Sequence, residues 1–253
     1  MTLSSYRSLC DDFFVEMYIN TELDLPTQRD TILAFFERVQ KQFPSMGHFY
    51  RRENSEYCLE EDRHLGQYRW IVLEIDRLGS GMVNPPTFDD AYCQDRLVLE
   101  IVPYMLGINH LDIHSLDVTL AMDFAYAGSH DEVIAEALLS STAFNCLLDL
   151  PSARPIGCSP AVVVALSDDE RTQARISVES KTSVYERAEK RRSSDDAISL
   201  SLTIRQYPQT DEKFDALKSF ERQCRLAEQL MAEKMGPNFV LPLTETIAQK
   251  RLT

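Results

Sequence analysis

The sequence has little glycine and lacks the short motifs that glycine builds around phosphate groups. Its 253 residues include eight glycines, and no G-x-G-x-x-G or G-x-x-x-x-G-K-[ST] segment occurs. Nucleotide binding through a glycine-rich loop is therefore excluded. There is also no G-x-S-x-G segment, so a hydrolase built on that turn has no support.

Long apolar runs are absent as well. The longest candidate, residues 97–106, is interrupted by Glu100 and Pro103, whereas a membrane-spanning helix needs about 20 apolar residues. The first residues do not combine a basic segment with an apolar core, which is the pattern of a secretory signal. We therefore expect a cytoplasmic protein.

Cysteines are never paired at short spacing. The six occur singly, as Cys10, Cys58, Cys93, Cys146, Cys158 and Cys224. This spacing disfavours both a zinc knuckle and a disulfide framework, and it predicts reduced, mostly buried thiols. Cys93 and Cys146 fall inside predicted helices, where we expect them to act as small buried hydrophobic residues.

Positive charge is in short supply. The chain has 26 Lys and Arg against 40 Asp and Glu, a formal net charge of −14. Nucleic-acid affinity depends on basic side chains that neutralise phosphates, so nucleic acid is an unlikely partner. Anionic membranes are disfavoured for the same reason. The remaining candidates are an unknown protein, a small polar ligand or a second copy of the chain.

Hydrophobic periodicity predicts the elements of the first half. Alternation over residues 13–19 indicates a strand, and an apolar stripe over residues 27–43 indicates a helix that Pro44 ends. Two strands are predicted, one within residues 48–59 and one over residues 68–75. Gly79-Ser80-Gly81 is expected to open a loop. A helix should follow over residues 87–106, kinked or ended by Pro103.

The second half begins with the clearest strand, where apolar and other residues alternate over residues 116–126. This period predicts that one face is buried and the other is not. A helix is predicted over residues 129–148 and a final one over residues 210–235. Three strands are predicted between them, over residues 161–166, 174–184 and 198–207. Residues 186–196 read as a long solvated hairpin loop.

This order, β-α-β-β-α and then β-α-β-β-β-α, suggests an internal duplication within one compact unit. The halves are residues 1–109 and 110–253. Similar helix starts support the hypothesis, because an S/T-x-x-D/E capping pattern begins at Thr27, Thr87 and Ser129, and two acids follow Thr210.

We predict an α+β fold with a mostly antiparallel sheet and all helices on its apolar face. The polar face would then be free for a ligand or partner. Its candidate residues are Glu16, Tyr18, Thr119, Asp123, Ser201, Thr203 and Arg205. Tyr18 offers flat apolar contact with a polar tip, and Arg205 is the natural partner of an anion. A bound partner should be polar or cationic.

The predicted architecture resembles duplicated, saddle-like folds, of which the TATA-binding protein is the familiar case. The resemblance concerns architecture and carries no function with it. That family reads DNA with a basic concave face, whereas this face is acidic and rich in hydroxyl groups.

Three segments carry a second resemblance, at the level of element order. They are WIVLEIDRLGSGMVNPPTFDDAY, LDVTLAMDFAY and LAEQLMAEKM. With them the chain resembles a sporadically distributed family of uncharacterised bacterial proteins, for which no chemistry is established.

The favoured hypothesis is a non-enzymatic binding module that uses the polar face or the groove between the halves, with no cofactor and no metal. The alternative is a metal-dependent enzyme centred on His110, Asp112 and His114. If that segment is extended, the three side chains share one face, and two imidazoles with a carboxylate can hold Zn²⁺ or Fe²⁺.

Overall fold

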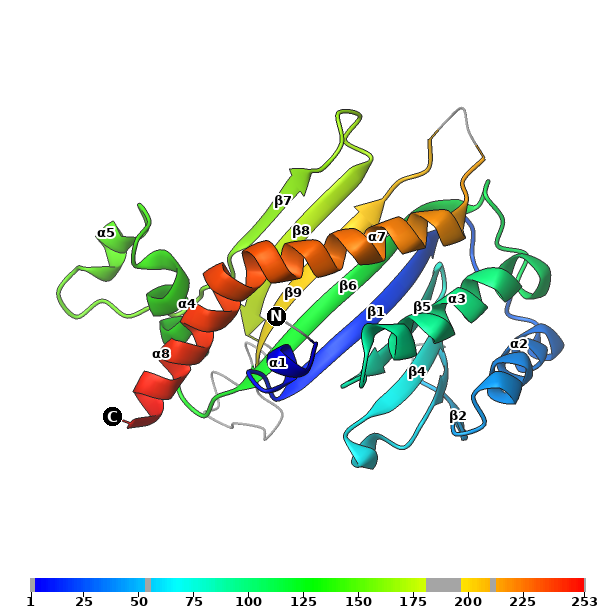
Figure 1. Ribbon diagram of the computed structural model, residues 1–253, viewed down its shortest axis with the longest axis horizontal. Coiled ribbons are helices and arrows are strands. Elements are labelled where there is room, and N and C mark those ends of the chain that lie inside the picture. Colours follow the sequence, from blue (N-terminus) through cyan, green and yellow to red (C-terminus); the bar gives the residue numbers. More distant parts are fainter. Residues whose placement is uncertain (1–2, 53–55, 181–196, 210–212, 253) are drawn as a thin grey trace.

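The computed structural model describes residues 3–52, 56–180, 197–209 and 213–252. All nine strands form one antiparallel sheet in the order β2-β3-β4-β5-β1-β6-β9-β8-β7 (Figure 1). The strands are β1 (Asp12–Thr21), β2 (His48–Arg51), β3 (Tyr57–Glu60), β4 (Tyr68–Leu73), β5 (Arg77–Val83), β6 (Ile113–Ala125), β7 (Ala161–Ala165), β8 (Thr172–Ser180) and β9 (Ala197–Gln206). The predicted antiparallel α+β class is confirmed.

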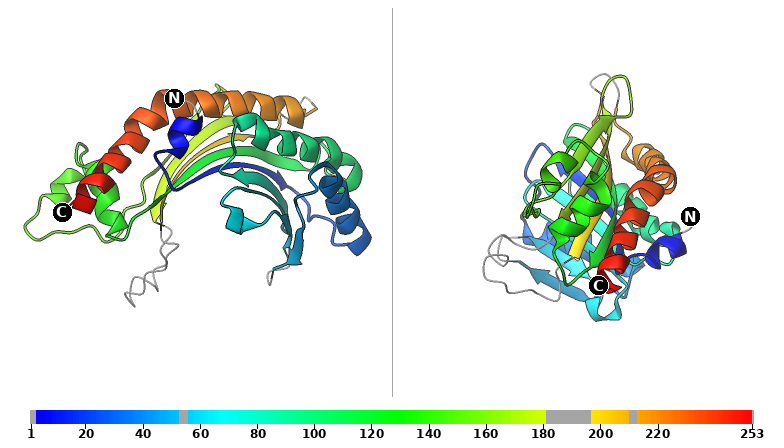
Figure 2. Two further views of the ribbon diagram at one scale, coloured as in Figure 1. Left: turned by 60° about the horizontal axis from the view of Figure 1, so that its bottom comes forward. Right: turned by 90° about the vertical axis from the view of Figure 1, so that its left-hand side faces the viewer.

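The sheet is curved, and the long helices lie over its convex face (Figure 2). The helices are α1 (Leu3–Arg7), α2 (Arg29–Gln42), η1 (Arg63–Leu65), α3 (Phe88–Met105), α4 (His130–Leu139), α5 (Asn145–Leu148), α7 (Ala216–Leu230), η2 (Met231–Val240) and α8 (Leu241–Leu252). Among the described residues, no long helix covers the concave face along most of its length. No helix among the described residues is long and apolar enough to cross a bilayer.

The core lies between the convex face and the helices. In β1 every second residue is buried, beginning with Phe13 and Val15. The rows continue across the sheet, so that Val15 lies beside Leu120 of β6, which lies beside Leu202 of β9. This alternation is what the sequence pattern predicted for a strand with one apolar face.

The prediction of one unburied face is wrong for β6. Leu120 is fully buried, as expected, but Asp117, Thr119 and Asp123 on the opposite face are also buried. β6 lies beside the central strand β1 and is paired along its length with β1 and β9. Side chains from both neighbours crowd the concave face there and exclude water from short polar groups.

Two predicted elements in the first half are also wrong. Gly79-Ser80-Gly81 is not a loop, because it forms the middle of β5 and pairs with both β1 and β4. The segment expected to hold one strand within residues 48–59 instead forms a hairpin of β2 and β3. Glycine lowered the apparent strand signal at β5, although a strand accepts glycine where another chain segment approaches closely.

The helices differ from prediction mainly at their ends. The helix expected over residues 129–148 divides into α4 and the short α5. The final helix begins at Ala216 and continues beyond residue 235 through the π-helical η2 into α8. Pro103 lies inside α3, which ends two residues later at Met105.

Helix capping follows the predicted S/T-x-x-D/E pattern at two of its three sites. Thr87 accepts from the Asp90 amide and Ser129 from the Glu132 amide. Thr27 does not cap α2, whose first residue follows Gln28. The cap of α7 is Asp215, which accepts from the Lys218 amide. Residues 210–212 and the predicted loop at 186–196 lie outside the described residues.

The cysteine prediction is partly confirmed. Cys58, Cys158 and Cys224 are buried free thiols. Cys93 and Cys146, expected to be buried, are exposed, because Cys93 lies on the outer side of α3 and α5 is too short to bury a face of its own.

Candidate functional site

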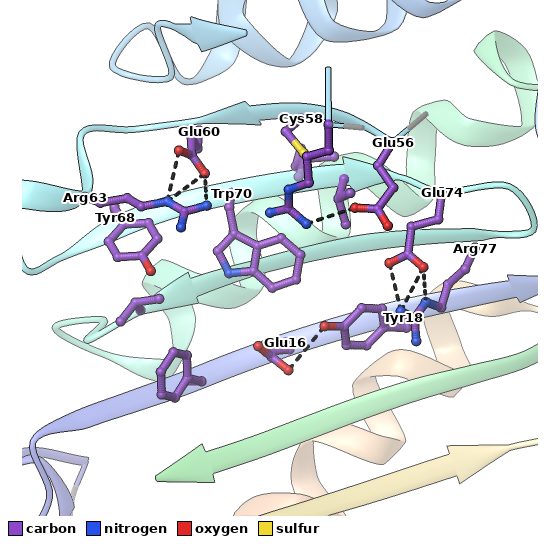
Figure 3. Close-up of a pocket in the computed structure, with 15 residues that line it drawn as sticks. Glu16, Tyr18, Glu56, Cys58, Glu60, Arg63, Tyr68, Trp70, Glu74 and Arg77 are labelled. Carbon is purple, nitrogen blue, oxygen red and sulfur yellow. Dashed lines mark hydrogen bonds and ion pairs between the residues drawn. The ribbon is translucent and has the colours of Figure 1, made fainter. Parts of the chain in front are cut away.

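The concave face is hollowed in the first half of the sheet, where residues of β1, β3, β4 and β5 line a cavity. The cavity there has a volume of about 400 Å³. Figure 3 shows its side chains pointing into the hollow from neighbouring strands. It is lined by Phe14, Glu16, Tyr18, Arg52, Glu56, Cys58, Glu60, Arg63, Tyr68, Trp70, Ile71, Val72, Glu74, Arg77 and Val83.

The floor of the cavity is aromatic. Trp70 of β4 and Tyr18 of β1 lie with their ring centroids 6.0 Å apart, on either side of β5. Between them β5 presents Gly79 and Gly81, where an added Cβ would lie 3.0 Å and 2.9 Å from the Trp70 ring. Both rings reach across β5 because these two positions have no side chain.

Three ion pairs surround this floor, each formed within the same hairpin or turn. Arg77 contacts Glu74 at 2.8 Å, Arg63 contacts Glu60 at 2.6 Å, and Arg52 contacts Glu56 at 2.9 Å. The guanidinium groups also lie near aromatic rings, since that of Arg77 is 4.6 Å from the Tyr18 centroid and that of Arg63 is 5.7 Å from the Tyr68 centroid.

The tyrosines and the cysteine that line the cavity keep their neutral forms at physiological pH. Burial raises the pKa of Tyr18, and the nearby Glu16 carboxylate raises it further. The Tyr18 hydroxyl donates to Glu16 Oε2 at 3.5 Å. Burial also raises the pKa of Cys58 and of Tyr68. The lining therefore offers neutral ring faces, a protonated thiol and carboxylates, and no activated nucleophile.

A buried polar cluster lies behind the floor, between β5 and α3. Ser80 Oγ donates to Asp95 Oδ1 at 2.6 Å, and Gln94 Nε2 donates to Ser80 Oγ at 2.9 Å. Gln94 Nε2 also reaches the carbonyl oxygens of Trp70 and Gly81. Burial raises the pKa of Asp95 to about 8. The cluster ties α3 to the backbone that carries the indole ring.

The second half of the concave face has a different character, because its polar side chains bind one another across the strands. Thr119 and Thr203 are joined by a hydroxyl–hydroxyl contact of 2.8 Å. Ser201 makes the same contact with Ser177 of β8. These groups lie side by side on β6, β9 and β8, and we call this row of hydroxyl contacts the ladder.

The ladder ends in a two-bond ion pair between Asp117 and Arg205. Arg205 Nε donates to Asp117 Oδ1 at 2.7 Å, and its Nη2 donates to Oδ2 at 2.6 Å. Hydrogen bonding to Asp117 raises the pKa of Arg205. The anion partner expected for Arg205 from the sequence is therefore a residue of the chain itself.

The seven residues predicted for a binding face do not form one surface. Glu16 and Tyr18 line the cavity, whereas Ser201, Thr203 and Arg205 lie in the ladder. The expectation that the whole set is exposed is wrong for Thr119 and Asp123, which are buried. Asp123 lies far along β6, opposite Asp12 of β1 and Ser199 of β9.

The three proposed metal ligands do not converge. β6 begins at Ile113, so residues 109–112 form a turn in which Asn109 accepts from the Leu111 amide. Asp112 accepts from the Leu23 amide, and His114 Nδ1 contacts Glu22 at 2.8 Å. The extended conformation that would place them on one face is absent. Within the described ranges, no cluster of three His, Cys, Asp or Glu side chains suits a metal ion.

Sequence reasoning missed most of the cavity, including Tyr68, Trp70 and the three arginines. One signal for the cavity was present in the sequence of β4. The strand alternates between two sets of residues, Tyr68, Trp70 and Val72 on one face of the sheet and Arg69, Ile71 and Leu73 on the other. The Gly79-Ser80-Gly81 segment carried the second signal, because glycine within a strand marks close approach of other groups.

No family model and no curated protein matches this sequence.

Proposed function

We propose that this protein is a non-enzymatic binding module whose cavity on the concave face takes a basic side chain of a polypeptide partner. The observation that carries the proposal is the aromatic floor formed by Trp70 and Tyr18 over the two glycines of β5. A ring face attracts a cation within about 6 Å of its centroid, most strongly when the ring is that of tryptophan.

Charge favours a cation over an anion. The lining contains four glutamates, Glu16, Glu56, Glu60 and Glu74, against three arginines. The formal net charge of −14 acts in the same direction at longer range, because it raises the local concentration of basic segments. The three arginines are paired with glutamates of their own hairpins, so they offer little free positive charge to an anion.

The ladder half supports the same choice by contrast. Its hydroxyl groups and its Asp117–Arg205 pair already have partners in the protein. A ligand there would have to replace existing hydrogen bonds, which leaves little net gain. The cavity offers the face of the Trp70 ring instead, where a cation has no hydrogen bond to replace, while the neighbouring Tyr18 ring already contacts Arg77 at 4.6 Å.

The single tryptophan of the chain, Trp70, makes the test direct. The probe is a short capped peptide of alternating lysine and glycine, compared with the same peptide carrying glutamate in place of lysine. We expect the lysine peptide to change the emission of Trp70, with an affinity that falls as salt rises. An equal response to the glutamate peptide, or no response to either, overturns the proposal.

Variants locate the binding. Tyr18→Ala should weaken the lysine peptide roughly tenfold, because it removes the ring that packs against Trp70 in the aromatic floor. Tyr104→Ala is the matched control, because Tyr104 is 89% exposed on α3 at the convex face. Equal affinities for the two variants would show non-specific attraction to an acidic protein rather than occupation of the cavity.

We further propose that the chain is an internal duplication with halves at residues 1–109 and 110–253, curved as a saddle. Supporting it, β1 and β6 are antiparallel neighbours at the middle of the sheet, and each is paired on its other side with the last strand of its own meander, β5 or β9.

The helix after each meander adds a second similarity. Gln94 of α3 donates to strand carbonyl groups at Trp70 and Gly81, and Gln223 of α7 donates to those at Leu116 and Ile204. Superposing the two halves tests the proposal, which fails if fewer than about three of the shared elements align.

A further inference from the structure

β7 forms one edge of the sheet (Figure 1), and it is unusual for an exposed edge because it carries no charge. Its sequence is Ala-Val-Val-Val-Ala. Val162, Val163 and Val164 are 61%, 57% and 47% exposed. Sheet edges are normally protected by lysine, proline, a bulge or a covering segment. The opposite edge, β2, contains His48 and Arg51.

The hydrogen bonds to β8 show which backbone groups of β7 are unused. Pro160 accepts from the Val178 amide at 3.0 Å, and the Leu166 amide donates to Thr172 at 2.7 Å. Bonded pairs alternate along an antiparallel ladder, so Val162 and Val164 bond to β8. The amide and carbonyl groups of Ala161, Val163 and Ala165 therefore point away from the sheet.

The side chains of β7 continue the rows of the core beyond the helices that cover it. Val162 lies beside Ile176 of β8, which lies beside the fully buried Leu202 of β9. Ile176 is half-buried, and Val162 is mostly exposed. The apolar row thus extends past the cover provided by α7, which packs on β6 and β9.

We propose that β7 pairs with β7 of a second copy of this chain, in antiparallel orientation about a two-fold axis at Val163. The segment reads the same in both directions, so the pairing places Val162 opposite Val164 and Ala161 opposite Ala165 of the other copy. Three bonded residue pairs give about six main-chain hydrogen bonds. On the helix side, Val162 and Val164 of both copies form one apolar cluster.

Repulsion between acidic turns favours the antiparallel over the parallel orientation. Asp168, Asp169 and Glu170 form the acidic turn between β7 and β8. In the antiparallel arrangement, Asp168 of one copy lies opposite Cys158 of the other. The two acidic turns are then roughly 30 Å apart along the strands, well beyond the screening length of about 8–10 Å. A parallel arrangement would place them side by side.

Sedimentation velocity of the full chain over a wide concentration range tests the proposal. The contact is small, so we expect a weak dimer that dissociates in the micromolar range. The apparent mass should rise from 29.0 kDa to twice that value. Amide hydrogen exchange supplies a second readout, because Ala161, Val163 and Ala165 should exchange more slowly as the dimer forms.

Three substitutions at one position separate dimer formation from folding. Val163→Pro removes an amide that β8 does not use, and it should abolish the dimer. Val163→Lys keeps the amide but places two like charges at the axis, and it should do the same. Val163→Thr keeps both the amide and the branched shape and should retain the dimer.

The emission of Trp70 and the far-ultraviolet circular dichroism should be unchanged in all three variants. A wild-type chain that remains at 29.0 kDa at every concentration, or a Val163→Lys variant that dimerises as the wild type does, overturns the proposal.

Discussion

The two halves of the concave face arrange their polar side chains differently. Around β6 and β9, short hydroxyl groups and the Asp117–Arg205 pair bind one another across the strands. Around β4 and β5, two glycines allow large rings to lie across the strands, and the ion pairs stand at the rim. The difference teaches that polar side chains on one face of a sheet can either bind one another across the strands or surround a cavity.

The largest effect is expected from the core that both halves share. Leu120 is fully buried at the centre of the sheet, so Leu120→Ala should lower the free energy of unfolding by about 2–5 kcal/mol. Urea unfolding should be followed by Trp70 emission, which reports on the cavity half, and by circular dichroism, which reports on both. Coincident transitions are expected of one cooperative unit. Separate transitions would show that the halves unfold independently.

The next effect concerns the acid behind the cavity floor. Burial raises the pKa of Asp95 to about 8 in the folded protein, above the value of about 3.9 for an unfolded chain. The stability from this group is complete below about pH 4 and is lost as pH rises toward 8. Asp95→Asn should therefore gain stability over the wild type as pH rises from about 4 to 8, by at most about 1.4 kcal/mol for each pH unit, and should be no more stable near pH 4.

Urea unfolding at low, neutral and high pH measures this difference. Asp24→Asn is the control, because Asp24 is exposed and its replacement should leave the pH profile unchanged. An Asp95→Asn profile parallel to that of the wild type would contradict a raised pKa at Asp95.

The glycines of β5 provide the third test, since the cavity depends on them. A Cβ at Gly81 would lie 2.7 Å from the Val15 carbonyl oxygen and 2.9 Å from the Trp70 ring. Gly81→Ala should cost about 1–3 kcal/mol and shift the emission of Trp70. Gly47→Ala is the matched control, because its nearest contact would be 4.0 Å away. An unchanged emission in Gly81→Ala would show that the indole ring does not rest on β5.

The smallest effect is expected in the ladder half. Asp117→Asn weakens the two-bond ion pair, but the Arg205 side chain is 41% exposed and can turn to water. The cost should be about 1 kcal/mol, with no change in Trp70 emission. Glu179→Gln, which weakens a longer pair whose partners are both over half exposed, should cost almost nothing. A response of Trp70 to Asp117→Asn would mean that the two halves of the face are coupled.

Part of the fold follows from local patterns in the sequence. Alternation over residues 13–19 and 116–126 predicted β1 and β6, and the capping residues Thr87 and Ser129 predicted the starts of α3 and α4. These features depend on neighbours within a few positions along the chain. The same reasoning missed β5, because glycine has a low intrinsic preference for strands. It is accepted in β5 because side chains from neighbouring strands approach the backbone closely there.

The sequence by itself determined the α+β class, the antiparallel sheet and the apolar face that the helices cover, because periods of two and of about 3.6 residues specify which side chains share a face. The tertiary structure alone decided which polar residues are available. Arg205 and Asp117 are 88 positions apart and pair across two strands, while Tyr18 and Trp70 approach across a third. Strand order and curvature set these distances, and no local spacing encodes them.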